Sequence, residues 1–339
     1  MSLPMPPDPY HLNGYHSTPQ PDEVPVTLEQ HIPWLHIFLF AATLLTTSLA
    51  GAFQQGADPF SDPKTILLGL PFAVTLMSIL LFHEMGHYLF ARYHGVRASL
   101  PYFIPGPPLF VGTFGAFIRM QSAPADRRAL FDVGAAGPWA GAMLAIPAVM
   151  LGLSLSEVRP LNPFNEGGII LGDSFLFSAL TRLILGVSAD NVTIILHPIA
   201  LAGWFGLFVT FLNLIPVGQL DGGHVAYSLF GRTHRWISRL ALVGILLLGF
   251  QGWEGWFFWV VLLALLGLDH PPTLDLTSPL DPRRRLYAWG TIGLFALTFI
   301  PVPISMVDQP EFPTGEVIHI NYLHTQPAPV RPFTFVYRP

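Results

Sequence analysis

The sequence contains no cysteine. Disulfide bonds, thiol nucleophiles and cysteine-ligated metal sites are therefore excluded. Any metal ion in this protein must be held by His, Asp or Glu, and zinc accepts that set of ligands.

Charged residues are also scarce. They make up 11% of the 339 residues, against about 25% in a typical soluble domain, while 51% are hydrophobic and the mean hydropathy is +0.50. A soluble protein of this length would need more polar residues to cover its surface. The composition therefore indicates a multi-pass membrane protein in a lipid bilayer. The net charge of -5 and the lack of a long basic run exclude a typical nucleic-acid-binding protein.

The first 31 residues lack Lys and Arg altogether and hold many prolines. Without basic residues they fit neither a signal peptide nor an organelle transit peptide. We therefore expect residues 1–31 to be a disordered cytoplasmic tail. Residues 32–305 are predicted to be a membrane domain with its core at about 65–305, and residues 306–339 an extracytoplasmic tail.

Seven apolar stretches predict an all-α membrane domain of about seven transmembrane helices. A further apolar piece, Phe175–Leu185, is short for a crossing, and we expect it at the membrane interface. The seven predicted spans are about Ile32–Phe53, Leu67–Tyr93, Leu130–Leu153, Pro198–Ile215, Trp236–Phe250, Trp253–Leu268 and Leu286–Ile304.

The second predicted span carries the motif His83-Glu-Met-Gly-His87. Two histidines four residues apart lie on one face of a helix. In the pattern His-Glu-x-x-His the two imidazoles bind zinc, and the glutamate acts as a general base on water. His83 and His87 are therefore candidate ligands, and Glu84 is the candidate base.

A catalytic zinc site needs a third protein ligand. His94 lies seven residues beyond His87, about 10 Å along a helix, which is too far. Asp221 follows the fourth predicted span, in a stretch whose prolines and glycines free the backbone to turn. We expect Asp221 to lie in a loop at the membrane depth of His83 and His87.

The orientation that brings these residues to one depth also agrees with the positive-inside rule. It places the N-terminus in the cytoplasm, the C-terminus outside and the candidate site near the cytoplasmic face. Eleven of the 16 basic residues are then cytoplasmic: Arg92, Arg97, Arg119, Arg127, Arg128, Arg232, Arg235, Arg239, Arg283, Arg284 and Arg285.

Residues 98–120 are apolar but too rich in Pro and Gly for a spanning helix. Phe114–Met120 is typical of a strand, entered through Gly112 and Gly115. At membrane depth, the N–H and C=O groups of a non-helical backbone need hydrogen-bond partners from the protein or from a water-filled cavity. We therefore expect a β-hairpin or re-entrant element beside the zinc site.

Four segments together resemble the site-2 protease family of intramembrane zinc metalloproteases, in particular its short bacterial members without a PDZ domain, which are related to a plastid group. The resemblance covers about residues 70–305, so the leading tail, the first span and the C-terminal tail have no counterpart in the family core. The four segments are His83–His87, Gly112–Arg119, Leu130–Pro138 and Asn213–Gly223.

The resemblance implies one Zn²⁺ on His83, His87 and Asp221, with Glu84 as base. Asn213 is implied to bind the substrate backbone or the oxyanion. His224 follows the ligand segment and is a candidate supporting residue, whereas Gly134, Gly137 and Gly141 are interpreted as helix-packing positions. The substrate-binding strand is implied to comprise Gly112, Thr113, Phe114, Gly115, Ala116 and Phe117.

These observations predict an intramembrane metalloprotease that cleaves a transmembrane protein substrate in a membrane such as the bacterial cytoplasmic membrane, as in regulated intramembrane proteolysis. A metal-binding transporter is one alternative, although internal repeats and ionisable residues on several spans are not visible. An inactive protease-like scaffold is another, and the intact Glu84 speaks against it. The substrate and the oligomeric state stay open.

Overall fold

The computed structural model describes residues 33–160, 168–186, 192–275, 278–307 and 335–338. Contacts divide the chain into Met1–Trp34 and Leu35–Pro339. The second unit, described below, holds every sheet and almost all of the helical structure. The predicted N-terminal tail and most of the predicted C-terminal tail lie outside the described residues.

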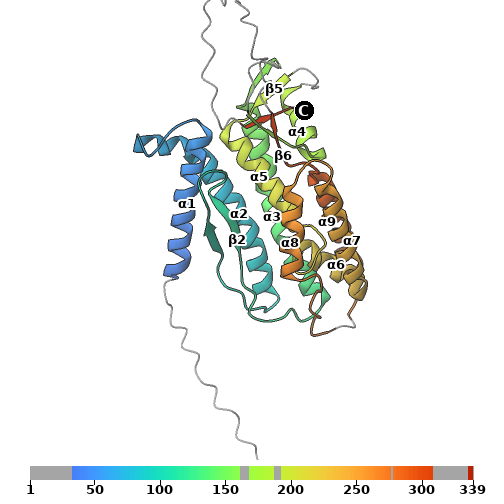
Figure 1. Cartoon of the computed structure of the whole chain (residues 1–339). Helices are drawn as coiled ribbons and strands as arrows, with labels where there is room; N and C mark the ends of the chain where they lie inside the picture. Colours follow the sequence, from blue (N-terminus) through green and yellow to red (C-terminus); the bar gives the residue numbers. More distant parts are fainter. Residues whose placement is uncertain (1–32, 161–167, 187–191, 276–277, 308–334, 339) are drawn as a thin grey trace, which may run out of the picture. The chain divides into compact units, whose positions relative to one another are not determined.

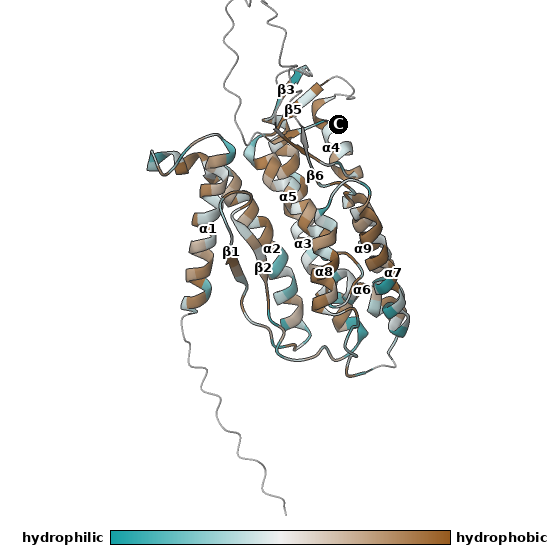
Figure 2. Ribbon diagram, in the orientation of Figure 1, coloured by the Kyte–Doolittle hydropathy of each residue, from teal (hydrophilic) through white to brown (hydrophobic). Residues whose placement is uncertain are grey.

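Three described helices are long and apolar enough to cross a membrane. They are α1 (Trp34–Gln54), α2 (Leu70–Tyr93) with the preceding 3₁₀ turn η1 (Pro63–Gly69), and α3 (Arg127–Ser154). Figure 2 shows hydrophobic residues along these helices. The first three predicted spans therefore match helices of sufficient length.

The four remaining predicted spans also coincide with helices, but these are shorter. They have 12 to 17 residues, whereas a membrane crossing needs about 20. The count of seven crossings therefore stays a prediction. These helices are α5 (Pro198–Asn213), α7 (His234–Gly249), α8 (Gly255–Leu266) and α9 (Pro282–Thr298).

Two short helices complete the helical part. The apolar piece expected at the interface forms α4 (Phe175–Leu185), which begins at a Ser174 cap. The segment after the fourth predicted span forms α6 (Asp221–Phe230), followed by the 3₁₀ turn η2 (Gly231–Thr233). In Figure 1, α2, α3 and α5 run beside one another, and α6 lies near one end of this group.

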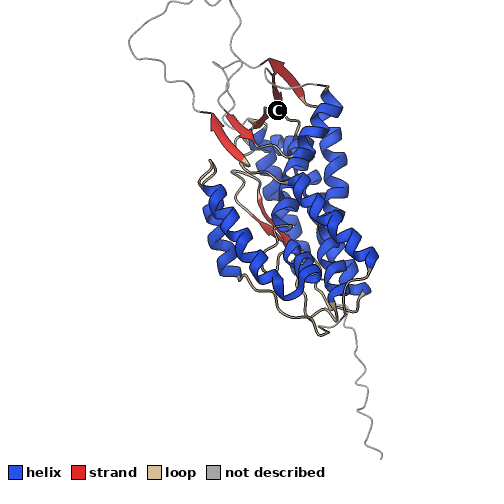
Figure 3. Ribbon diagram, turned by 90° about the vertical axis from the view of Figure 1, so that its right-hand side faces the viewer, coloured by secondary structure: helices blue, strands red, loops and turns tan. Residues whose placement is uncertain are grey.

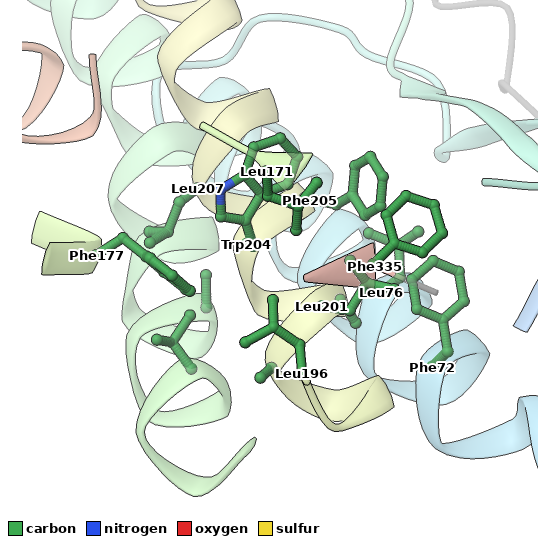
Figure 4. Close-up of a cluster of buried hydrophobic side chains, with 14 of the residues drawn as sticks. Phe72, Leu76, Leu171, Phe177, Leu196, Leu201, Trp204, Phe205, Leu207 and Phe335 are labelled. Atoms are coloured by element: carbon green, nitrogen blue, oxygen red, sulfur yellow. The ribbon is translucent and has the colours of Figure 1, made fainter. Parts of the chain in front are cut away.

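The main hydrophobic core lies between α2, α3 and α5 (Figure 4). Phe72 and Leu76 of α2 meet Leu201 and Phe205 of α5 there. Trp204 is fully buried, and its indole nitrogen donates to the carbonyl oxygen of Gly172 at 2.9 Å. This core holds α5 against α2, the helix that carries His83. It thereby also positions the segment that leads from α5 to α6.

The predicted hairpin is present. Strand β1 (Tyr102–Pro105) pairs antiparallel with β2 (Thr113–Phe117), and the register is irregular at Ile104 and Pro105. The predicted strand Phe114–Met120 therefore overlaps β2. Thr46 of α1 donates to the Gly112 carbonyl at 2.6 Å, so the turn of the hairpin is held by α1 (Figure 1).

A second sheet corrects the all-α prediction. It has five strands in the order β3-β5-β7-β4-β6, and only β4 and β7 run parallel. The strands have three or four residues each, too few for a clear alternating pattern. In Figure 1, β5 and β6 lie near α4, and Figure 3 shows most of the strands, in red, at one end of the helices. The strands of this sheet are β3 (Glu157–Pro160), β4 (Gly168–Leu171), β5 (Val192–Ile195), β6 (Ile304–Val307) and β7 (Phe335–Tyr337).

Candidate metal centre

The three residues of the zinc motif lie on α2 and are buried. His83, Glu84 and His87 are 3%, 5% and 7% exposed. Ionisable groups on an apolar helix are costly to bury unless neighbouring groups satisfy them. The surrounding helices should therefore supply partners for these side chains, and they do.

Asp221 reaches the two histidines from a different helix. The sequence placed it in a loop, but it is the first residue of α6. A Cβ at Gly222 would lie 2.0 Å from the carbonyl oxygen of Leu214, so α6 begins in close contact with the end of α5. The partial positive charge at a helix N-terminus favours a carboxylate in the first turn. These contacts hold the Asp221 side chain against α2.

The spacing of the three donor atoms fits zinc. The Nε2 atoms of His83 and His87 are 3.1 Å apart, and Oδ2 of Asp221 lies 3.2 Å and 3.3 Å from them. Ligands at about 2.0–2.2 Å from a tetrahedral zinc ion lie about 3.3–3.6 Å from one another. Within the described part of the chain, this is the one group of three His, Asp or Glu residues that could hold a metal ion.

The tautomer of His87 is also suited to metal binding. Its Nδ1 lies 2.7 Å from the carbonyl oxygen of Val133 on α3. Because a carbonyl only accepts hydrogen bonds, Nδ1 carries the proton and donates it. Nε2 then presents its lone pair toward Asp221 and His83, as a metal ligand requires.

The glycines of α3 lie at close-packed positions, as the sequence predicts, and what packs against them is the site itself. A Cβ at Gly137 would lie 2.0 Å from Nε2 of His87, and one at Gly141 would lie 3.1 Å from Nδ1 of His83. At Gly134 an added Cβ would lie 2.5 Å from Cβ of His224. These positions leave the space that the imidazoles occupy. Their spacing of three and four residues placed them on one helix face, but only the fold shows that this face meets the site.

Gly137→Ala should therefore weaken zinc binding. The added methyl group would overlap the donor atom of His87 and push the ring away, and we expect at least about a 10-fold loss of zinc affinity. Gly244→Ala on α7 is the matched control, because nothing lies within 4 Å of its added Cβ. Zinc titration of both purified variants checks this. Equal affinities would show that Gly137 does not make room for the ligand.

Asn213 and the hairpin lie next to this cluster. Nδ2 of Asn213, the last residue of α5, is 3.1 Å from Nε2 of His83. The backbone of Ile118, directly after β2, lies near the Glu84 carboxylate, and α2 contacts β2. In the two-stranded sheet β2 pairs with β1 on one side only, and Phe114 is 73% exposed. The structure thus brings the predicted strand Gly112–Phe117 beside the predicted base.

The other histidines near the motif do not join the cluster. His94 contacts Asp132, with Nε2 and Oδ2 2.8 Å apart, in line with its exclusion as a ligand. Nδ1 of His224 lies 2.7 Å from Nε2 of His270, and Nδ1 of His270 donates to the carbonyl of Pro271 at 2.6 Å. His224 therefore holds α6 to the segment around His270, and its supporting role at the site stays a prediction. Sequence reasoning did not find His270.

Comparison with known proteins decides the family. The family model "Peptidase family M50" matches residues 71–250, which include all three donors, Glu84 and Asn213. The chain belongs to peptidase family M50. The part of the chain that matches the M50 model runs from α2 to α7. It therefore contains both the motif on α2 and the start of α6.

Named relatives agree with the M50 assignment. "Probable zinc metalloprotease EGY1, chloroplastic" of Arabidopsis thaliana is 35% identical over 302 residues, which cover 82% of this chain and 54% of the relative. "Probable zinc metalloprotease EGY2, chloroplastic" of the same plant is 32% identical over 267 residues, which cover 78% and 47%. The chain thus spans about half the length of these curated relatives. Because both are chloroplast proteins of a plant, they do not support the short bacterial subtype.

Proposed function

We propose that this protein is a zinc endopeptidase that hydrolyses peptide bonds within or next to transmembrane segments of other proteins. One observation carries the proposal. Two imidazoles of an apolar helix long enough to cross a membrane meet a carboxylate from another helix at the spacing of zinc ligands. Glu84 lies between those imidazoles in the chain and is not one of the donors.

The chemistry is divided among the chain's own residues. His83, His87 and Asp221 would hold zinc, which supplies Lewis acidity and lowers the pKa of water to about 7. Glu84 takes the proton from the attacking water and later gives it to the leaving amine. The Asn213 amide, whose Nδ2 lies 3.1 Å from Nε2 of His83, would donate a hydrogen bond to the developing oxyanion.

The hairpin provides a place for the substrate. A peptide bond within a helix is hydrogen-bonded and shielded, so a transmembrane substrate must unwind before it can be cut. The edge of β2 that pairs with no strand among the described residues can then accept the extended segment as an added strand. Gly112–Phe117 would thereby hold the scissile bond near Glu84.

The membrane arrangement is part of the proposal. It has seven crossings, a cytoplasmic N-terminus, an extracytoplasmic C-terminus and a site near the cytoplasmic face. The distribution of arginines supports it, and we keep the bacterial cytoplasmic membrane as the proposed location. A transmembrane protein is the proposed partner.

A reporter that is active only outside the cytoplasm tests this topology. Fused at the C-terminus it should be active, because an odd number of crossings separates it from the cytoplasmic N-terminus. The same reporter placed after Arg285 should be inactive and serves as the control. If only the fusion after Arg285 were active, the orientation in the membrane would be the opposite of the proposed one.

Zinc-dependent cleavage of a membrane-embedded peptide tests the function. The purified protein, reconstituted in liposomes with a peptide of one transmembrane segment, should cut within or beside the apolar stretch. A zinc chelator should abolish the cut, and added zinc should restore it. Cleavage that persists without zinc would contradict the proposal. Metal transport across the liposome membrane without cleavage would favour the transporter alternative.

A further inference from the structure

A large groove lies on the outside of α2, α3 and α9, away from the zinc ligands. Its volume is about 1290 Å³. Phe82 and Leu89 of α2 and Met143 of α3 line it and are 51%, 57% and 69% exposed. Trp139 forms part of its wall and donates from its indole nitrogen to Thr291 of α9 at 3.0 Å.

The groove is separate from the path of a substrate. Its lining on α2 includes Phe82, Met85, Leu89 and Tyr93, which share one helix face because they are three or four residues apart. Glu84 does not line the groove; its position in the helix turns it away from that face. A peptide lying in the groove would therefore be out of reach of the predicted base.

One end of the groove is charged. Arg284 of α9 forms ion pairs with Asp132 at 2.6 Å and with Asp281 at 2.7 Å, and His94 also contacts Asp132. The hydrogen bonds from Arg284 lower the pKa of Asp281 to about 2, so its carboxylate is ionised at neutral pH. Both carboxylates that line the groove are therefore already paired with a cation.

Arg283 leaves a positive charge at this end. It lines the groove, is exposed and has no carboxylate partner among the residues that the structure describes. Arg284 already holds both carboxylates of the lining, so Arg283 is the guanidinium left to bind an anionic group.

We propose that this groove binds one anionic glycerophospholipid, with its phosphate at Arg283 and its acyl chains along Phe82, Met85 and Met143. Basic pockets between membrane helices bind anionic headgroups, and they lie on the side of the membrane where basic residues collect. Tyr93 and Tyr287, 79% and 65% exposed, border the charged end, as aromatic side chains do at the level of lipid headgroups. The proposal rests on insertion in a membrane and not on proteolysis.

Native mass spectrometry with added phosphatidylglycerol or phosphatidylcholine tests whether the groove prefers an anionic headgroup. The full chain should retain one phosphatidylglycerol in preference to phosphatidylcholine. Arg283→Gln should weaken phosphatidylglycerol binding about fivefold, the effect expected for one basic residue near an anionic lipid. Arg285→Gln is the matched control, because Arg285 is exposed in the same arginine run and does not line the groove. It should bind like the wild type.

A second pair of variants tests the apolar part. Met143→Trp should narrow the groove and lower retention, whereas Leu151→Trp, on an exposed part of α3 outside the groove, should not. Equal binding of the two lipids by every variant would overturn the proposal. So would a dimer that Met143→Trp disrupts without changing lipid binding, because the groove would then be covered by a second copy. Since no readout is cleavage, failure here leaves the protease proposal standing.

Discussion

Glu84→Gln should abolish proteolysis while zinc stays bound. The glutamine amide has the size of the carboxylate but cannot take a proton from water, and general-base catalysis is worth about 10²–10⁴-fold in rate. Zinc binding should be kept because the three donor atoms belong to His83, His87 and Asp221. Cleavage of a co-expressed transmembrane reporter and the zinc content of the purified protein measure the two effects separately.

Glu157→Gln is the control for this experiment. Glu157 is an exposed carboxylate on β3, paired with Arg159, and belongs to the five-stranded sheet rather than to the cluster. We expect wild-type cleavage from it. Undiminished cleavage by Glu84→Gln would contradict the mechanism and favour an inactive or differently catalysed protein.

Asp221→Ala should lose most of its zinc. Two imidazoles remain, and a catalytic zinc site normally needs three protein ligands. The loss should appear as a zinc content well below one ion per chain after dialysis, and as a thermal unfolding temperature that no longer rises with added zinc. Both measurements are independent of any substrate.

Asp269→Ala is the comparison for this variant. Asp269 is exposed and lies 3.8 Å from Arg239, so its removal should leave the zinc content unchanged. Full zinc occupancy in Asp221→Ala would remove Asp221 from the ligand set.

The sequence predicted best what is local. His83, Glu84 and His87 lie in one helix, so their spacing alone places them together. Asp221 could be predicted as the third ligand because the distribution of basic residues orients the predicted spans. That orientation puts Asp221 at the same membrane depth as His83 and His87, although they are far apart in the sequence. The distribution could not show that Asp221 begins a helix, since that depends on the contact of Gly222 with Leu214.

Features that depend on long-range contacts were missed. The role of Gly137 becomes visible only when α3 packs against α2. The five-stranded sheet joins strands from residues 157–195 with strands after residue 303, and each is too short to show a period of two. His270 carries no motif, and its contact with His224 arises from the fold.

X-ray absorption spectroscopy of the zinc-loaded protein reports directly which atoms bind the ion. We expect one zinc ion per chain with two imidazole ligands, the remaining ligands being oxygen atoms. In Asp221→Ala this signal should be lost. Three imidazoles would contradict this expectation, because His83, His87 and Asp221 supply only two.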